Sequence, residues 1–184
     1  RVASGGLVAI DWLSLGRERF EQIVQALALR ELGGRFRVEA IEGKGGDGGR
    51  DIEVLGDDHI EAVLQLKYFP EGISGPNRGR RHQIQRSWQT LQGVSKVKTE
   101  QLASWPRGRP RTWILVVPCI LSDGDRAFLE GLTSESGVEQ IVWDRPWLDE
   151  RLAQHTNLYQ YFETQLLDDR VRLYSREKDV LAGG

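Results

Sequence analysis

Three side chains with complementary chemistry stand in two neighbouring segments of the chain. Asp51 follows a glycine-rich turn, and Gln65 and Lys67 stand two residues apart in a later apolar run. Residues two apart on a β-strand share a face, so Gln65 and Lys67 are expected to point the same way. If the two segments pair as strands, a carboxylate, an amide oxygen and an ammonium group meet on one patch. This trio suits a divalent cation and a water molecule that attacks a phosphodiester.

The expected cation is Mg²⁺, or Mn²⁺ in its place. Mg²⁺ prefers oxygen ligands, usually one or two carboxylates, with waters and phosphate oxygens completing an octahedron. We expect Asp51 to supply the direct carboxylate, and the Gln65 side-chain oxygen and the Leu66 carbonyl to supply further oxygens. Lys67 would orient the attacking water and stabilise the pentavalent phosphate. Glu21, on an earlier helix, would hold a second metal or its water shell.

Each of these acidic and basic residues also has a structural interpretation. Asp51 suits a strand edge, and Lys67 suits a strand end where its stem covers apolar surface. Glu21 suits a solvated helix face. Glu53 shares the face of Asp51, either as a third acid near the metal or as a cross-strand partner of a lysine. Asp47 lies in the glycine-rich turn, where aspartate favours local hydrogen bonding, so we interpret it as structural.

The elements that must position these side chains follow from apolar periodicity. A helix is predicted from an N-cap at Ser14 to Gly33, with Phe20, Ile23, Val24, Leu27 and Leu32 on one face. Strands are predicted at about 36–41, 51–55, 62–68, 113–117 and 138–143. Further helices are predicted at about 81–91, after Ser122 or Asp123, at 146–152 and near 158–167. This order predicts an α/β fold in which helices flank both faces of a mixed central β-sheet.

Composition favours one soluble globular domain. The chain has 184 residues, of which 39% are hydrophobic and 28% charged, enough for a substantial core. It has no apolar run of 18 residues, so no membrane span is expected. The single cysteine, Cys119, excludes an internal disulfide, fits a reducing cytoplasm and is expected to be a buried or rim thiol.

The ends of the chain suggest a piece of a longer protein with additional domains. The chain starts at an arginine and contains no methionine. We expect an N-terminal extension at 1–13, an endonuclease-like domain at 14–167, and a polar tail or linker at 168–184.

Charge is distributed unevenly along the chain. Between Arg78 and Arg111, nine basic residues oppose one acid, so this segment carries +8 and the remainder −10. Such asymmetry indicates a basic face for a polyanion; the alternative is a solvated loop and helix surface. The candidate DNA contacts are Arg78, Arg80, Arg81, Arg86, Arg107 and Arg109. Trp88 and Trp105 lie in the same stretch, and burial against the sheet is the favoured interpretation for Trp88.

The motifs together resemble a known superfamily. Phe20-Glu21, then Gly46-Asp47-Gly48-Gly49-x-Asp51, then Gln65-x-Lys67 resemble the restriction-endonuclease-like PD-(D/E)XK superfamily, in particular its Mrr-like branch with the pattern Asp-Xn-Gln-x-Lys. The segment 142–148 resembles a late strand-to-helix feature of such nucleases, and the resemblance covers roughly residues 14 to 155. It implies an α-β-β-β-α-β core, divalent-metal DNA cleavage and a role in defence. Glutamine at 65 in place of an acid implies weaker metal binding, and Arg50 stands where the superfamily's name has proline.

These observations predict a metal-dependent DNA endonuclease that serves as the nuclease effector module of a larger, defence-type protein. Such a module would form a dimer or higher oligomer to cut both strands. The alternatives are a catalytically inactive nucleic-acid-binding module on the same fold, and a nuclease specific for RNA or for branched structures. Nucleotide hydrolysis is not supported, because the glycine-rich turn at 43–49 lacks the Lys-Ser/Thr of a phosphate loop.

Overall fold

A computed structural model describes residues 10–41, 50–74, 79–92 and 110–165. Its centre is a five-stranded sheet with the strand order β1-β2-β3-β4-β5. The strands are β1 (Arg37–Ala40), β2 (Ile52–Leu55), β3 (Ile60–Leu66), β4 (Thr112–Val116) and β5 (Glu139–Trp143). The first three strands pair antiparallel, and β3, β4 and β5 pair parallel. The predicted mixed sheet is therefore confirmed, and β3 is the strand at which the pairing changes.

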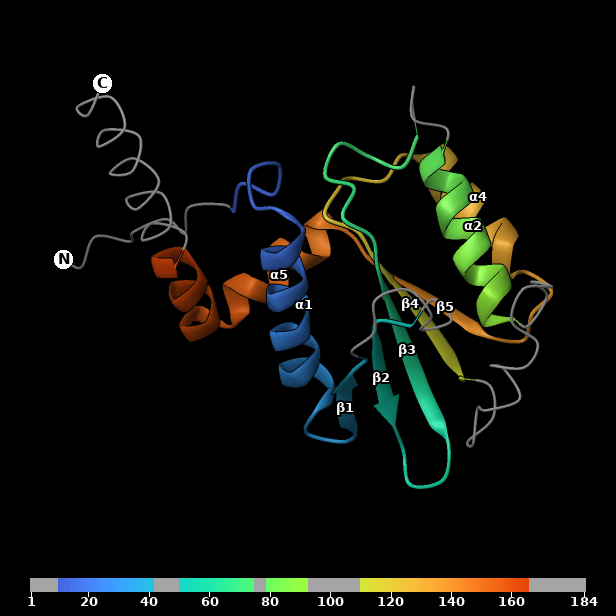
Figure 1. Cartoon of the computed structure of the whole chain (residues 1–184), viewed down its shortest axis with the longest axis horizontal. Coiled ribbons are helices and arrows are strands. Elements are labelled where there is room, and N and C mark those ends of the chain that lie inside the picture. Colours follow the sequence, from blue (N-terminus) through green and yellow to red (C-terminus); the bar gives the residue numbers. More distant parts are fainter. Residues whose placement is uncertain (1–9, 42–49, 75–78, 93–109, 166–184) are drawn as a thin grey trace, which may run out of the picture.

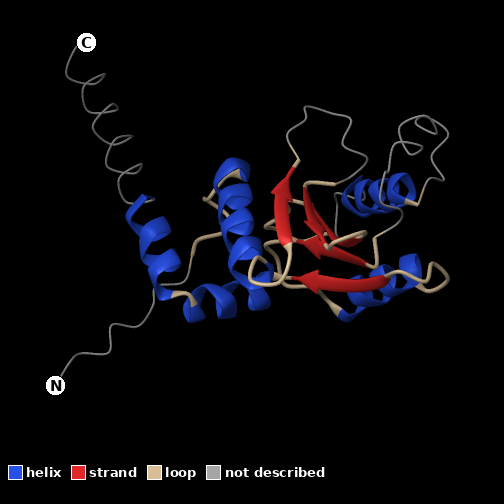
Figure 2. Ribbon diagram, turned by 90° about the horizontal axis from the view of Figure 1, so that it is seen from below, coloured by secondary structure: helices blue, strands red, loops and turns tan. Residues whose placement is uncertain are grey.

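Helices cover both faces of this sheet. Helices α1 (Arg17–Leu32) and α5 (Arg145–Gln154) lie on one face, and α2 (Gly79–Leu91) and α4 (Asp123–Thr133) lie on the other (Figure 1). The same three layers are visible from below (Figure 2). Residues 156–165 form a further helix, and its Tyr159 and Phe162 are buried beside α1 and α5. The element order α-β-β-β-α-β and the flanking helices are those that the sequence predicts.

Two apolar cores follow from the alternation of side chains along the strands. The core between α1 and the sheet includes Leu64 and Leu66 of β3, and the core between α2 and the sheet includes Val63. On α2, the predicted apolar face of Ile84, Trp88 and Leu91 is buried in the second core. The ring of Trp88 lies 4.8 Å from that of Trp113 on β4, which confirms its burial against the sheet.

The helix starts agree with the sequence except at α1. The helix α4 begins with a capping box in which Ser122 and Asp125 bond each other's backbone N–H groups, and Asp144 caps α5. Ser14 is not the N-cap of α1, so that prediction is wrong. The N-cap is Gly16, whose φ of 80° favours glycine, while the Ser14 hydroxyl donates to the Asp11 carboxylate at 2.7 Å.

The segment before α1 packs against the rest of the fold. Ile10 and Trp12, which precede the expected start of the domain at residue 14, are buried. The Trp12 indole N–H donates to Asp149 on α5 at 2.7 Å. Among the helices that the structure describes, none combines the length and apolarity that a membrane crossing requires.

Candidate functional site

The backbone of Asp51 lies beside the end of β3. The two strands pair up to Ile52 and Leu64, and Asp51 stands directly before β2. The Asp51 N–H donates to the Leu64 carbonyl at 3.0 Å, and the Asp51 carbonyl accepts from the Ile41 N–H at 2.9 Å. The backbone of Asp51 is thus fixed from both sides at the start of β2.

Strand alternation places Gln65 on the face of the sheet that α2 covers. Ile52, Leu64 and Leu66 belong to the core under α1, whereas Val63 belongs to the core under α2. Gln65 alternates with Leu64 and Leu66, so it projects from the face that α2 covers. Asp51 precedes β2 and Lys67 follows β3, so a common face for the three side chains stays a prediction.

The carboxylate of Asp51 is aimed at β3 by a hydrogen bond. Its Oδ2 atom accepts the backbone N–H of Leu66 at 2.7 Å. Within a strand, the N–H and C=O of one residue point to the same side, so the Leu66 carbonyl also points toward β2. Asp51, Gln65 and the Leu66 carbonyl are thus the oxygen donors of this part of the hairpin.

The side chain of Gln65 is buried, and its amide lacks hydrogen bonds to the described residues. Only 1% of the residue is exposed, and neither its Oε1 nor its Nε2 has a hydrogen-bond partner within the part of the chain that the structure describes. An unbonded buried amide is destabilising by about 1–3 kcal/mol, and such groups are rare in folded proteins. An amide oxygen in this position is an available ligand for a hard cation.

Lys67 stands one residue beyond the end of β3. Its N–H continues the parallel ladder by donating to the Val116 carbonyl at 2.9 Å, and its own carbonyl accepts from the Phe69 N–H at 2.9 Å. The chain therefore turns away from the sheet directly after Lys67, and the lysine side chain lies at the mouth of the hairpin.

The two glutamates that the sequence singles out lie in ion pairs. Glu53 pairs with Arg50, and both side chains are largely buried. This arginine takes the place of the lysine partner that was one interpretation of Glu53. Glu21 pairs with Arg17 at 2.6 Å on α1, which packs on the opposite face of the sheet from Gln65. Its predicted role in holding a second metal stays a prediction.

The described residues contain no cluster of three or more His, Cys, Asp or Glu side chains that could hold a metal ion. Asp47 lies outside the described residues. Among the described residues, the candidate oxygen donors are the Asp51 carboxylate, the Gln65 amide and the Leu66 carbonyl.

Two of the arginines predicted to contact DNA, Arg80 and Arg81, form hydrogen bonds with other residues of the chain. Arg80 donates to the Gly72 carbonyl and to Glu71, both at 2.7 Å, and its guanidinium lies 5.5 Å from the centre of the Phe69 ring. Arg86 is exposed on α2. Arg78, Arg107 and Arg109 lie outside the described residues, as do Trp105 and most of the basic segment.

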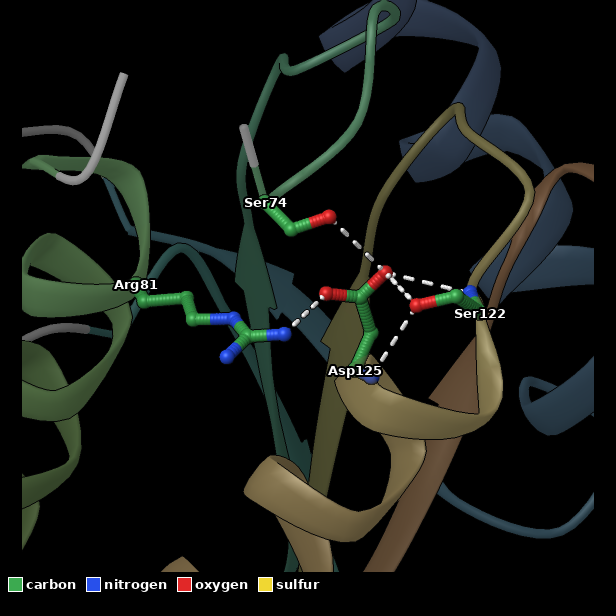
Figure 3. Close-up of polar contacts among 4 residues, drawn as sticks. All are labelled: Ser74, Arg81, Ser122 and Asp125. Atoms are coloured by element: carbon green, nitrogen blue, oxygen red, sulfur yellow. Dashed lines mark hydrogen bonds and ion pairs between the residues drawn. The ribbon is translucent and has the colours of Figure 1, made fainter. Parts of the chain in front are cut away.

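Arg81 is part of a buried polar cluster that the sequence alone does not reveal (Figure 3). Its guanidinium pairs at 2.7 Å with the carboxylate of Asp125, which is 3% exposed. The second carboxylate oxygen accepts from the Ser122 hydroxyl at 2.7 Å, and Ser74 approaches it at 3.4 Å. Burial raises the pKa of Asp125, but the hydrogen bonds from Arg81 and Ser122 outweigh burial and leave this pKa below its usual value. The cluster joins α2 to the start of α4.

Cys119 lies near this cluster and is buried, as predicted. Burial raises the pKa of its thiol to about 11, and the charges of Asp125 and Asp144 add to the shift. A thiol with this pKa is a poor nucleophile at neutral pH.

No family model and no curated protein matches the sequence. Among solved structures, the chain is similar to the MspJI restriction endonuclease in complex with a 27-mer oligonucleotide, with a TM-score of 0.39 and 20% identity over 77% of this chain. The chain spans 29% of the length of that protein's chain. The fold class rests on the strand order and connections of the chain itself.

Proposed function

We propose that this chain is a divalent-metal-dependent endonuclease domain that hydrolyses phosphodiester bonds in DNA. The observation that carries the proposal is the buried amide of Gln65, which has no hydrogen-bond partner among the described residues. Asp51 accepts the N–H of the next residue, Leu66, and Lys67 follows Gln65 by two residues. A purely structural hairpin would gain stability from an apolar residue at position 65. A site that binds an ion through this oxygen gives a reason for the amide.

The donor set fits Mg²⁺ or Mn²⁺. Asp51, the Gln65 side-chain oxygen and the Leu66 carbonyl would hold the ion, and all three are hard oxygen donors. When bound, the metal would neutralise charge on the scissile phosphate. Asp51 is held for this task by the Leu66 N–H. With a single carboxylate in the set, metal affinity is expected to be modest.

Lys67 acts on the water and on the phosphate in this proposal. Its ammonium group would donate hydrogen bonds that orient the attacking water, and its charge would stabilise the phosphate oxygens as negative charge develops. Arg86, exposed on α2, would contact the DNA backbone without reading sequence. The domain would act as the nuclease effector of a larger, defence-type protein of the Mrr-like branch and would dimerise to cut both strands.

Plasmid cleavage in Mg²⁺ or Mn²⁺ tests the proposal. Asp51→Asn and Lys67→Ala should abolish the metal-dependent product, because each removes a charge that the reaction needs. Asp57→Asn is the matched control, since Asp57 is an exposed aspartate in the turn between β2 and β3 and its loss should leave the rate unchanged. Cleavage that persists in purified Asp51→Asn or Lys67→Ala would rule out this mechanism.

The second candidate is a nucleic-acid-binding module without turnover. It is favoured by the single carboxylate of the donor set and by the engagement of Glu53 with Arg50. It predicts salt-sensitive DNA binding with no metal-dependent product. Parallel assays on duplex DNA, branched DNA and RNA distinguish it from the proposed activity and from a nuclease of different substrate choice.

A further inference from the structure

Tyr68, the residue after Lys67, connects the end of β3 to the start of α1. Its hydroxyl accepts the Gly16 N–H at 2.9 Å and donates to the Trp12 carbonyl at 2.7 Å. The Leu13 carbonyl lies 3.2 Å from the same oxygen and shares its proton. One phenol group thus satisfies backbone atoms at three positions of the segment that leads into α1.

The segment held by Tyr68 is itself fixed to other elements. Gly16 is the N-cap of α1 and has no side chain to cap the helix, and Tyr68 accepts its N–H. The Tyr68 ring lies 5.6 Å from that of Phe20 in the first turns of α1. Trp12 is buried and bonds Asp149 on α5. The segment that Tyr68 binds is therefore itself held by two helices, α1 and α5.

Lys67 depends on this anchor because of its place in the chain. It follows the last residue of β3, and its N–H donates to the Val116 carbonyl on β4. The backbone turns directly after it. Lys67 and Tyr68 share one planar peptide bond, so fixing the Tyr68 side chain on the α1 side restricts the backbone torsions that set the direction of Lys67.

We propose that Tyr68 is a positioning residue that sets the orientation of Lys67 through its hydrogen bonds to the segment before α1. This inference rests on the proposed function for its catalytic consequence, but the positioning itself is a structural property. A small misplacement of a catalytic group commonly lowers the rate by one to two orders of magnitude. Loss of the Tyr68 hydroxyl should therefore slow cleavage without weakening DNA binding.

The test compares Tyr68→Phe with Tyr159→Phe in the full chain. Tyr159 is a buried tyrosine of the same apolar core, so the control removes the same atom from a similar environment. Three properties are measured: amide hydrogen exchange of residues 12–16, the Lys67 ¹³Cε resonance, and kcat and KM for plasmid cleavage. The lysine resonance is assigned by its absence from Lys67→Arg, and urea unfolding shows that each variant is folded in the assay.

In Tyr68→Phe, amide exchange in the segment before α1 should rise about tenfold, the Lys67 resonance should shift, and kcat should fall about tenfold at unchanged KM. Tyr159→Phe should change none of these. A mere loss of folded protein lowers the amplitude of the Lys67 signal but does not move it. An unmoved Lys67 resonance, or unchanged exchange at Gly16, would overturn the proposal. If the wild-type chain cleaves nothing, the proposed function fails, and the exchange and resonance measurements still decide the role of Tyr68.

Discussion

Replacing Gln65 with methionine tests separately how the buried amide affects stability and how it affects cleavage. Methionine has nearly the volume of glutamine and is unbranched, so it can occupy the same buried space. The substitution removes two polar atoms that have no partner among the described residues. If the Gln65 amide is kept to bind an ion, Gln65→Met should be more stable than the wild type and inactive.

The size of the gain follows from the burial of Gln65. With 1% of the residue exposed, the amide has lost almost all contact with solvent. Leaving such a group unbonded is destabilising by about 1–3 kcal/mol. Imperfect packing of the new side chain offsets part of this, since volume-conserving core changes cost up to about 1.5 kcal/mol. A net gain of about 1 kcal/mol is expected, which raises Tm by about 2–4 °C in a chain of this size.

Urea unfolding in metal-free buffer, with and without added Mn²⁺, measures both effects. The control is Leu115→Met, because Leu115 on β4 pairs with Gln65 and is buried on the same face. This control removes no unbonded polar atom, so its free energy of unfolding should fall by up to about 1.5 kcal/mol. Mn²⁺ should stabilise the wild type and Leu115→Met, since a ligand that binds only the folded state raises its stability, and should do little for Gln65→Met.

Two results would contradict this role of Gln65. A loss of more than about 1 kcal/mol in metal-free Gln65→Met would mean that the amide is satisfied in the folded protein, because hydrogen bonds worth keeping were removed. Full cleavage activity in a stabilised Gln65→Met would mean that the buried amide plays no part in the chemistry.

Three further predictions concern groups around the site. Asp125→Asn should lose about 2 kcal/mol at pH 7, because Arg81 is left without its partner. The pKa of Asp125 is lower in the folded protein than in the unfolded chain, so its stabilisation is present above the unfolded-state pKa and is lost as the pH falls through the folded-state pKa. Urea unfolding from about pH 7 to pH 2.5 should therefore show the free energies of unfolding of the wild type and Asp125→Asn converging in acid. Arg86→Ala should lower by about 1 the slope of log K for DNA binding against log salt concentration. Arg80→Ala should mainly lower stability, because the contacts of Arg80 lie within the chain. Binding titrations and thermal melts of both variants distinguish the two effects. Cys119, with a pKa of about 11, should react with an aromatic disulfide at pH 8 at least about 100-fold more slowly in the folded protein than in urea, and equal rates would contradict its burial.

Periodicity in the sequence is enough to predict most of the fold. The stripe of Ile84, Trp88 and Leu91 and the continuous apolar run of β4 identify a covering helix and a central strand because burial imposes these patterns. The start of α1 is predicted wrongly because Ser14 is a favoured N-cap residue, but its hydroxyl bonds Asp11. A local preference was overridden there by a turn that Tyr68 holds from 52 residues away.

Some features of the candidate site can likewise be predicted from the sequence, and others depend on how the elements pack. That Gln65 and Lys67 share a face is expected from strand geometry alone, and β3 contains Gln65 and ends one residue before Lys67. The bond between Asp51 and the Leu66 N–H depends on the register of two strands, which spacing does not determine. The contacts of Arg80 and Arg81 depend on how α2 docks against α4, so a run of positive charge in the sequence could not show which arginines are engaged within the chain.

The hairpin of β2 and β3 makes the donor residues a local unit. Asp51 and Gln65 are 14 residues apart and meet through one tight turn, whereas 45 residues separate β3 from β4. Closing a longer loop is inexpensive, since doubling its length adds only about 0.6 kcal/mol. The part of this connection outside Lys67, Tyr68 and α2 can therefore diverge or accept inserted sequence while the proposed ion-binding oxygens keep their spacing. Replacing only the part between α2 and β4 is a route to changing substrate preference without touching the proposed chemistry.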